Sequence, residues 1–428
     1  MNTIIQNVLL NEKIVHIYIQ DNIIQYIADT NNTESLQNAP TYNTNECQII
    51  DGTNKVALPT IANGHNHAAM SLFRGYGDDL PLMQWLQEKI WPVEAKLTEE
   101  DVYWGTKLAC LEMIRTGTTY FNDMYWHFHG TAQAVEEMGL RAHISSVFID
   151  IDDPKKAAEQ QEQTIQLHEE SKKYSRRIQF ALGPHALYTV SKQSLEWIRD
   201  YSQKHNLLIH FHLAETKLDQ TTTLEKYNQN PIHFLESIQF LSPRLIGCHG
   251  VQLNEEELDI LKKYDVALVH NPCSNLKLAG VNFFPYKQIK EKNIRFCIGT
   301  DGCASNNNLN MLEETKFATL LQKWIQNDTT QFPAHEAWKT ITQTAHEIFQ
   351  IPAGIIQENK YADLMLLNLN DIHMTPHHDI ISNLIYSVPT SAIDTVLCDG
   401  KILMQNKIIP QEQEIIQQIH TTAQKISQ

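Results

Sequence analysis

Residues 207–250 read LLIHFHLAETKLDQTTTLEKYNQNPIHFLESIQFLSPRLIGCHG, and this stretch decides the fold class. Its two short apolar runs, LLIHFHL and LIGCHG, have the length and composition of buried strands. The polar segment between them carries apolar residues at helical spacing, which predicts a helix over residues 222–238. A strand, a helix and a second strand in this order predict two parallel strands joined by a crossover helix.

The same alternation of strands and helices continues on both sides of this stretch. Apolar runs such as RAHISSVFID, IQFALG, VALVHN and FCIGTD are strand-like, and helical patterns follow most of them. Helices are expected over residues 191–205 and 254–264, and others should begin near Pro154 and Asn310. Repeated strand–helix units predict a parallel sheet, either open and doubly wound or closed into a (β/α)8 barrel.

Both ends of the chain have a different pattern. Residues 1–57 contain the β-rich runs IIQNVLL, IVHIYIQ and IIQYIAD, separated by turn signals. Residues 357–428 contain further strand-like runs and the hairpin-type turn Asp399-Gly400. We expect the two ends to pair in one composite β-sandwich over residues 1–57 and 357–428, which flanks an α/β domain over residues 58–356.

Composition excludes several classes of protein. Asp and Glu number 50 against 34 Lys and Arg, and the resulting formal net charge of -16 disfavours a general nucleic-acid binder. No basic leader opens the chain, and no window approaches the roughly 20 apolar residues of a membrane span. The 7 cysteines are scattered and never spaced as CxxC, which argues against a disulfide framework and predicts a cytoplasmic protein.

Polar residues lie where the expected strands end. They are His65, His67, His185, His212, His249, His270, Asn271 and Asp301. Barrel enzymes build their active sites from the carboxyl ends of the strands. This placement therefore favours the closed barrel over the open sheet.

His65 and His67 are two residues apart on a strand, so their side chains should share a face about 7 Å apart. Both imidazoles could then reach one zinc ion at ~2.0–2.1 Å. His212 and Asp301 can supply the third and fourth ligands, and such a His3Asp set suits zinc. His210 lies on the same face as His212 and stays open as the alternative ligand.

Two further polar residues could take part in catalysis. Glu215 follows His212 by three residues, which places a carboxylate beside the metal where it could transfer protons. Its alternative role is that of an acidic residue at the start of a helix. His249 ends the next strand and could orient a metal-bound water.

Five sequence blocks, in the same order along the chain, resemble the amidohydrolase superfamily and in particular the methylthioadenosine/S-adenosylhomocysteine deaminases. The blocks are NGHNHAAMSLFRGYGDDLPLMQWLQEKIWPVEAKL (63–97), GPHALYT (183–189), HFHLAET (210–216), HNPCSNLKLAG (270–280) and GTDGCASNNNLNMLEE (299–314). The motif GDDLPLMxWLxxxIWPxE is specific to this branch. The chain ends match the family's flanking β-sandwich only in type.

The resemblance implies a distorted (β/α)8 barrel, or TIM barrel, with one divalent metal that is usually zinc. The implied metal ligands are His65, His67, His212 and Asp301. Glu94 resembles the family's ligand for the ribose hydroxyls, and His185 resembles a second contact to the nucleoside. We interpret Trp85 and Trp91 as core aromatics.

The implied reaction is hydrolytic deamination of an adenine nucleoside at C6. A zinc ion lowers the pKa of its bound water to about 7, which supplies hydroxide at neutral pH. Asp301 would accept the proton of that water, His249 would hold its oxygen, and Glu215 would protonate N1 and help ammonia to leave.

The substrate is less constrained by the sequence. Family members that take S-adenosylhomocysteine commonly present arginines to its carboxylate, whereas this chain has Ser145 and Ser146 in the segment concerned. Arg141 is present but lies early in its strand, where a salt bridge is its simplest role. Methylthioadenosine is therefore favoured, with S-adenosylhomocysteine or adenosine also possible.

Two other functions stay open at this point. One is a deaminase or chlorohydrolase of the same superfamily that acts on a different heterocycle, and the other is a non-catalytic nucleoside-binding protein. In each case the expected partner is a small molecule, and the chain could form a homo-oligomer.

A second HxH pair, His127 and His129, has no matching set of ligands, so we expect it in a loop or pocket wall.

Overall fold

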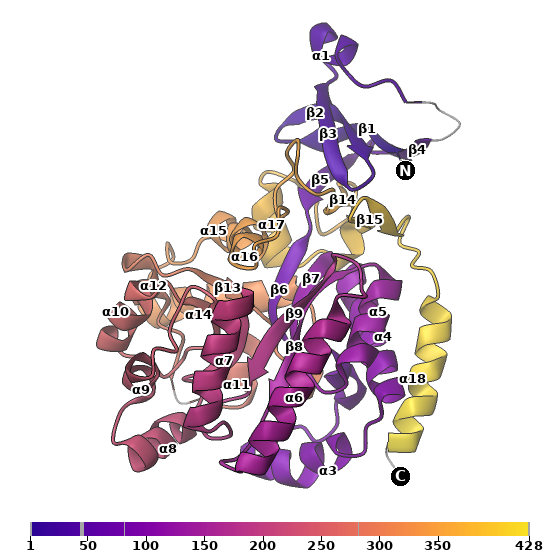
Figure 1. The fold of residues 1–428 in the computed structure, drawn as a ribbon. Coiled ribbons are helices and arrows are strands. Elements are labelled where there is room, and N and C mark those ends of the chain that lie inside the picture. Colours follow the sequence, from indigo (N-terminus) through magenta and orange to yellow (C-terminus); the bar gives the residue numbers. More distant parts are fainter. Residues whose placement is uncertain (1, 43–46, 81, 281, 427–428) are drawn as a thin grey trace.

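The computed structural model describes residues 2–42, 47–80, 82–280 and 282–426. Its middle part is an eight-stranded parallel sheet that curls into a nearly closed barrel (Figure 1). The strands follow one another around the barrel in chain order: β6 (Ile61–Asn66), β7 (Thr118–Met124), β8 (Arg141–Phe148), β9 (Ile178–Pro184), β10 (Ile209–Leu213), β11 (Leu245–His249), β12 (Ala267–His270) and β13 (Phe296–Ile298). The predicted barrel is confirmed, although β7 was missing from the expected strands.

The first and last barrel strands meet next to His65 and Asp301, two of the predicted metal ligands. The Asp301 amide, just beyond β13, donates a hydrogen bond to the carbonyl of His65 in β6 at 3.0 Å. The buried Asn63 side chain donates to Thr300 Oγ1 at 2.7 Å across the same seam. Closure of the barrel therefore brings residues 65 and 301 together.

A set of helices surrounds the barrel, and several of their ends follow the sequence signals. They are α4 (Glu99–Arg115), α5 (Phe128–Met138), α6 (Pro154–Ser171), α7 (Lys192–His205), α8 (Lys217–Tyr227), α9 (Pro231–Ser237), α10 (Glu255–Lys263) and α14 (Met311–Gln326). Ser191, Asn254 and Asn310 cap α7, α10 and α14 as expected.

The single helix expected over residues 222–238 was wrong. The structure has α8 and α9 instead, because Asn228 adopts a left-handed conformation with φ 52° and Pro231 starts a new helix.

The remaining helices are short, apart from the closing helix α18. They are α1 (Thr33–Gln37), α2 (Leu82–Trp85), α3 (Trp91–Glu94), α11 (Pro272–Lys277), α12 (Tyr286–Glu291), α13 (Cys303–Asn306), α15 (Ala334–Lys339), α16 (Ala345–Ile348), α17 (Ile380–Ser387) and α18 (Glu412–Ile426). Segments of 3-10 helix cover Ala68–Phe73 and Thr390–Ala392, and π-helical turns cover Leu86–Ile90 and Thr340–Thr344.

A separate mixed sheet is built from both ends of the chain, as predicted. Its strands are β1 (Asn2–Leu10), β2 (Lys13–Gln20), β3 (Ile23–Asp29), β4 (Cys47–Asp51), β5 (Lys55–Pro59), β14 (Leu364–Asn368), β15 (Ile393–Cys398) and β16 (Lys401–Met404). The two ends join where β5 pairs antiparallel with β14. Asp399 and Gly400, both with positive φ, form the turn between β15 and β16.

This outer sheet lies at the end of the barrel where the strands begin, whereas α3 and α8 lie at the opposite end (Figure 1). Arg141, the first residue of β8, donates through Nε to Asp363 at 2.6 Å and through Nη2 to Asp399 at 2.7 Å. The interpretation of Arg141 as a salt-bridge residue is therefore confirmed.

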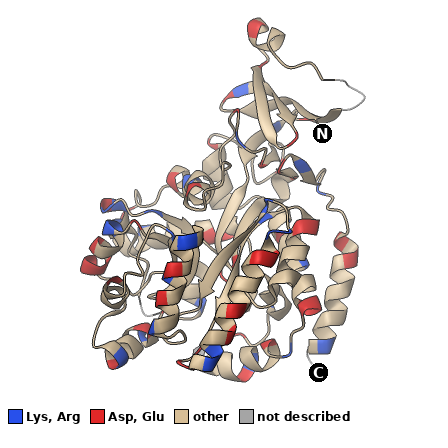
Figure 2. Cartoon of the chain, viewed as in Figure 1, with Lys and Arg blue, Asp and Glu red and all other residues tan. Residues whose placement is uncertain are grey.

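The surface carries both signs of charge. Acidic and basic residues alternate over the outer helices in the face shown in Figure 2. Within the residues that the structure describes, no helix has the length and apolar character needed to cross a bilayer.

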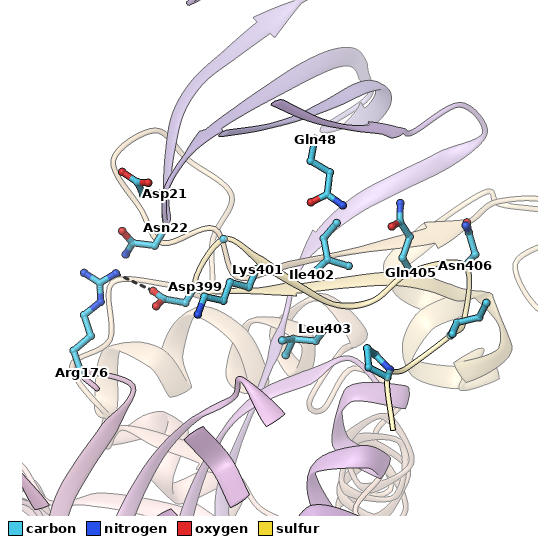
Figure 3. Close-up of a pocket in the computed structure, with 13 residues that line it drawn as sticks. Asp21, Asn22, Gln48, Arg176, Asp399, Lys401, Ile402, Leu403, Gln405 and Asn406 are labelled. Carbon is cyan, nitrogen blue, oxygen red and sulfur yellow. Dashed lines mark hydrogen bonds and ion pairs between the residues drawn. The ribbon is translucent and has the colours of Figure 1, made fainter. Parts of the chain in front are cut away.

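A groove of about 830 Å³ lies beside the hairpin β15–β16, between Gln48 and Leu403, where Arg176 pairs with Asp399 at 3.1 Å (Figure 3). It belongs to the outer-sheet end, far from the carboxyl ends of the barrel strands.

Candidate active site

Four side chains from three different strand ends converge at the carboxyl end of the barrel. His67 Nε2 lies 3.1 Å from Asp301 Oδ1 and 3.4 Å from His212 Nε2. His65 Nε2 lies 3.4 Å from the same Asp301 oxygen. The structure thus brings together the four side chains that the sequence analysis selected.

Each of the three imidazoles makes a hydrogen-bond contact through its Nδ1 atom, on the side of the ring away from Asp301. The contacts are His67 Nδ1–H to the Met124 carbonyl at 2.6 Å, His212 Nδ1–H to the His185 carbonyl at 2.9 Å, and His65 Nδ1 with His210 Nε2 at 2.6 Å. Because a carbonyl only accepts, Nδ1 of His67 and of His212 carries a proton, so each ring in its neutral form turns an Nε2 lone pair inward.

Three of the separations between these ligand atoms come close to those around a tetrahedral metal ion. Ligand distances of ~2.0–2.1 Å imply edges of roughly 3.3–3.4 Å between the ligand atoms, and the separations above come close to that value. His65 Nε2 is buried and has no hydrogen-bond partner among the described residues. A cation at this point would satisfy it. Three imidazoles and one carboxylate form a donor set that suits zinc.

The electrostatics of the four candidate ligands also favour a bound cation. Burial opposes a positive charge on His67, but the neighbouring Asp301 outweighs it and raises the pKa of His67 to about 9. Although burial acts in the opposite direction, the neighbouring imidazoles of His65 and His67 hold the pKa of Asp301 well below its usual range. The site therefore attracts positive charge, and a divalent cation would take the place of the proton.

Asp301 is fixed by its surroundings. Its backbone has a φ of 60°, and Ser274 and Ser305 donate hydroxyl hydrogen bonds to Oδ2 at 2.6 and 3.0 Å. The other oxygen, Oδ1, accepts from the Gly302 amide at 2.9 Å and faces the histidines. One carboxylate oxygen is thus held by hydroxyls, and the other is presented to the site.

His210, the alternative ligand, lies one layer deeper than His212. It is buried, and its two ring nitrogens contact His65 Nδ1 at 2.6 Å and Ser145 Oγ at 3.3 Å. Both nitrogens are therefore engaged away from Asp301, which makes His210 a support for His65.

Glu215 and His249 lie next to this cluster. His249 Nε2 is 3.8 Å from Glu215 Oε1, and burial raises the pKa of Glu215 above its ordinary value. A carboxyl group with a raised pKa holds a proton more readily near neutral pH, which a general acid requires. Asp219 Oδ2 fixes the loop by accepting from the backbone amides of Glu215 and Thr216, each at 3.2 Å.

A cavity of about 590 Å³ opens beside the cluster and contains Glu94. It is lined by Trp91, Glu94, Ala95, Leu97, Glu99, Tyr125, Trp126, His127, Phe128, His129, Ser145, Ser146, Val147, Gln163, Gln166, Leu167 and Glu170. Burial raises the pKa of Glu94, while the nearby Tyr125 and Trp126 act in the opposite direction. The pocket-wall position expected for His127 and His129 is confirmed.

The two tryptophans of the diagnostic block differ. Trp85 is buried, as expected for a core aromatic, but Trp91 is 46% exposed and lines the cavity. The core interpretation of Trp91 was wrong, because α3 turns this side chain outward at the edge of the site. The ring of His185 lies 4.8 Å from that of His212, next to the candidate ligands.

Comparison with known proteins agrees with this geometry. The model of the amidohydrolase family matches residues 56–403. This range includes the whole barrel and the region where β5 pairs with β14 in the outer sheet. The chain belongs to the amidohydrolase family. The 5'-deoxyadenosine deaminase of Methanospirillum hungatei is 46% identical over 87% of this chain and 83% of its own length.

Two further proteins are similar to this amidohydrolase. The 5-methylthioadenosine/S-adenosylhomocysteine deaminase 1 of Archaeoglobus fulgidus is 40% identical over 89% of this chain and 90% of its own. A crystal structure of an adenosine deaminase from Xanthomonas campestris with bound zinc superposes with a TM-score of 0.90 at 29% identity, covering 100% and 98% of the two chains.

The sequence analysis of this amidohydrolase placed Asn271 at a strand end but gave it no role, and it missed the other side chains that support the site. Asn271 and Asn275 contact His249 Nδ1, and Ser274 binds Asp301. All three belong to the HNPCSN segment, whose density of short polar residues at a strand end was the available signal. Asp123, at the end of the overlooked β7, is buried and accepts from the Ala68 amide at 2.7 Å.

Proposed function

We propose that this amidohydrolase is a metal-dependent deaminase that converts an adenine nucleoside to the inosine-type product and ammonia. The observation that carries the proposal is the cluster of His65, His67, His212 and Asp301, in which Asp301 Oδ1 lies 3.1 and 3.4 Å from the Nε2 atoms of His67 and His65 and His212 Nε2 lies 3.4 Å from His67 Nε2, with Glu215 beside it. The names of the relatives support the same reaction class.

His65, His67, His212 and Asp301 would hold one divalent metal ion, with zinc favoured by the donor set. When bound, such an ion lowers the pKa of water and so supplies hydroxide at neutral pH. Asp301 Oδ1 accepts the proton of the attacking water, and its Oδ2 stays bound to Ser274 throughout.

Glu215 and His249 act on the adenine ring and on the attacking oxygen. Glu215, whose pKa burial raises, delivers a proton to N1 as C6 becomes tetrahedral. His249 holds the attacking oxygen in line with the ring. The hydroxyl proton of the tetrahedral intermediate then restores Glu215 as the C6 carbonyl forms. Asp301 gives the proton that it took from the water to the amino group, the C6–N bond breaks, and the group leaves as ammonia.

The cavity suggests which nucleosides fit. Glu94 would bind the ribose hydroxyls, and His185 would make a second contact to the nucleoside. The described lining residues include Glu99 and Glu170 but no Lys or Arg, so a substrate carboxylate would enter without a countercharge. Methylthioadenosine stays favoured, and the name of the Methanospirillum relative adds 5'-deoxyadenosine to the uncharged candidates. S-adenosylhomocysteine and adenosine are weaker candidates.

We also propose a cytoplasmic location. The cysteines in the described part of the chain are all free thiols, which suits a reducing compartment.

The experiment is an ultraviolet deamination assay of metal-loaded protein with methylthioadenosine, 5'-deoxyadenosine, adenosine and S-adenosylhomocysteine. We expect the highest kcat/KM with the two uncharged 5' substituents and a loss of about tenfold or more with S-adenosylhomocysteine. Ammonia release from guanine or a triazine alone would favour a different heterocycle. Tight nucleoside binding without ammonia would favour a binding protein, and either result would refute the proposal.

A further inference from the structure

We propose that Asn271 and Asn275 are positioning residues that fix the tautomer of His249, with its proton on Nε2. This inference rests on the proposed function, because it gives His249 a role as a hydrogen-bond donor to the reacting oxygen. It also explains why His249, which lies among the other histidines, is not a metal ligand.

The contacts of His249 are the reverse of those of its neighbours. His67 and His212 donate through Nδ1 to backbone carbonyls, so their Nε2 atoms carry lone pairs. In contrast, His249 Nδ1 faces the amide nitrogens of Asn275 at 3.0 Å and Asn271 at 3.3 Å. Because an amide NH2 group only donates, His249 Nδ1 must offer a lone pair, and the proton of the neutral ring lies on Nε2.

The Nε2 atom of His249 points into the site. It is buried, has no hydrogen-bond partner among the described residues, and lies 3.8 Å from Glu215 Oε1. The ligand nitrogens of His65, His212 and His249 lie within 4.8 Å of one another, so the opposite tautomer would offer a competing metal site. An N–H at this position cannot bind a metal but can donate to a substrate or water oxygen.

Helix α11 and its N-cap hold both asparagines in place. Asn271 is fully buried as the N-cap residue, and its carbonyl accepts the Asn275 amide at 3.0 Å. Ser274, between them, donates to Asp301 Oδ2 at 2.6 Å. One helical turn therefore orients His249 and Asp301 together. His249 itself has a φ of 77°, which sets the direction of its ring at the end of β11.

The test is 15N NMR of zinc-loaded protein labelled at histidine, with the His249 signals assigned from their loss in His249→Gln. We expect a pyridine-like Nδ1 and a pyrrole-like Nε2 in the wild type. In Asn275→Asp the new carboxylate accepts a proton from Nδ1, so Nδ1 should become pyrrole-like. We also expect kcat to fall by at least about tenfold with little change in KM or zinc content.

Asn282→Asp is the control, because it adds the same charge in the following loop, where Asn282 Nδ2 contacts Gln252 and not His249. It should leave the His249 signals and kcat unchanged. A pyrrole-like Nδ1 in the wild type would overturn the inference. The wild-type spectrum alone therefore tests the tautomer, even if Asn275→Asp fails to fold. The signals need no turnover, so an inactive protein with a pyridine-like Nδ1 would refute only the proposed function.

Discussion

Glu215 is the residue that best distinguishes a deaminase from a barrel that only binds a metal ion. It directly precedes Thr216, the N-cap of α8, and its Oε1 lies 3.8 Å from His249 Nε2. It is also buried, and burial raises the pKa of its carboxyl group. Its chemistry is therefore testable without disturbing the four candidate ligands.

Replacing Glu215 by Gln keeps the size of the side chain and removes the proton that it would transfer. We expect kcat to fall by about 10²–10⁴-fold with zinc content unchanged, as measured by the deamination assay and by metal analysis. Glu225→Gln, on the exposed face of α8, is the matched control and should retain full activity. Full turnover of the Glu215 variant would remove this residue from the mechanism.

Asp219 predicts a pH dependence of stability. Burial raises its pKa from 3.8 to about 7, so between these values the folded chain binds a proton that the unfolded chain does not. The free energy of unfolding should therefore fall as pH rises through this range. Asp219→Asn removes this dependence. Between about pH 5 and about pH 7, the free energy of unfolding of the variant should therefore rise by about 2 kcal/mol relative to that of the wild type.

Urea unfolding at the two pH values measures this difference. Asp200→Asn serves as the control, since the Asp200 side chain is 65% exposed and should show no relative gain. An equal pH dependence in the wild type and Asp219→Asn would contradict the assignment of a raised pKa to this group.

At the scale of elements, local signals predicted the helices well where caps are explicit. Helices α7 and α10 begin after Ser191 and Asn254, as the sequence indicated. The break between α8 and α9 was missed although Pro231 marks it, because the apolar spacing on either side continues in phase. Strand β7 was missed because its sequence, TTYFNDM, mixes polar and aromatic residues although every one of them is buried.

The site was predictable only in part, for a physical reason. Histidines and an aspartate at strand ends are visible in the sequence, since the barrel brings all such ends to one rim. The partners of these groups depend on three-dimensional packing. The carbonyls of Met124 and His185, which orient two imidazoles, leave no trace in the side-chain pattern.

Helix α18 gives a prediction at this scale. It packs along α4 beside the barrel (Figure 1), and Ile415 is fully buried, whereas the adjacent Ile416 is 41% exposed. Ile415→Ala should lower the free energy of unfolding by about 2–4 kcal/mol, as measured by urea denaturation. Ile416→Ala should cost less than about 1 kcal/mol. Equal effects would show that α18 does not dock as described.

At the scale of the whole molecule, the outer sheet and the barrel are linked by a buried ion pair. We propose that the division at residues 57/58 and 356/357 describes two structural units that meet at this link. The Arg141 and Asp363 side chains are only 3% and 0% exposed. Removing one partner of such a pair leaves an uncompensated buried charge, which is far more costly than the loss of a surface contact.

Arg141→Met should therefore destabilise the chain by about 3–5 kcal/mol, as measured by equilibrium unfolding. Arg176→Met is the control, because Arg176 also pairs with Asp399 but its side chain is 55% exposed. That variant should cost no more than about 1 kcal/mol. If the two variants were equally stable, the buried pair would not be the link between the sheet and the barrel.

The most direct test of the central claim is an anomalous difference map, recorded at the zinc edge from crystals of zinc-loaded, active protein. We predict a single strong peak within ~2.0–2.2 Å of His65 Nε2, His67 Nε2, His212 Nε2 and an Asp301 oxygen. A peak bound instead by His210 and Cys248, or one that includes His249, would contradict the account. So would the absence of any peak at the barrel mouth.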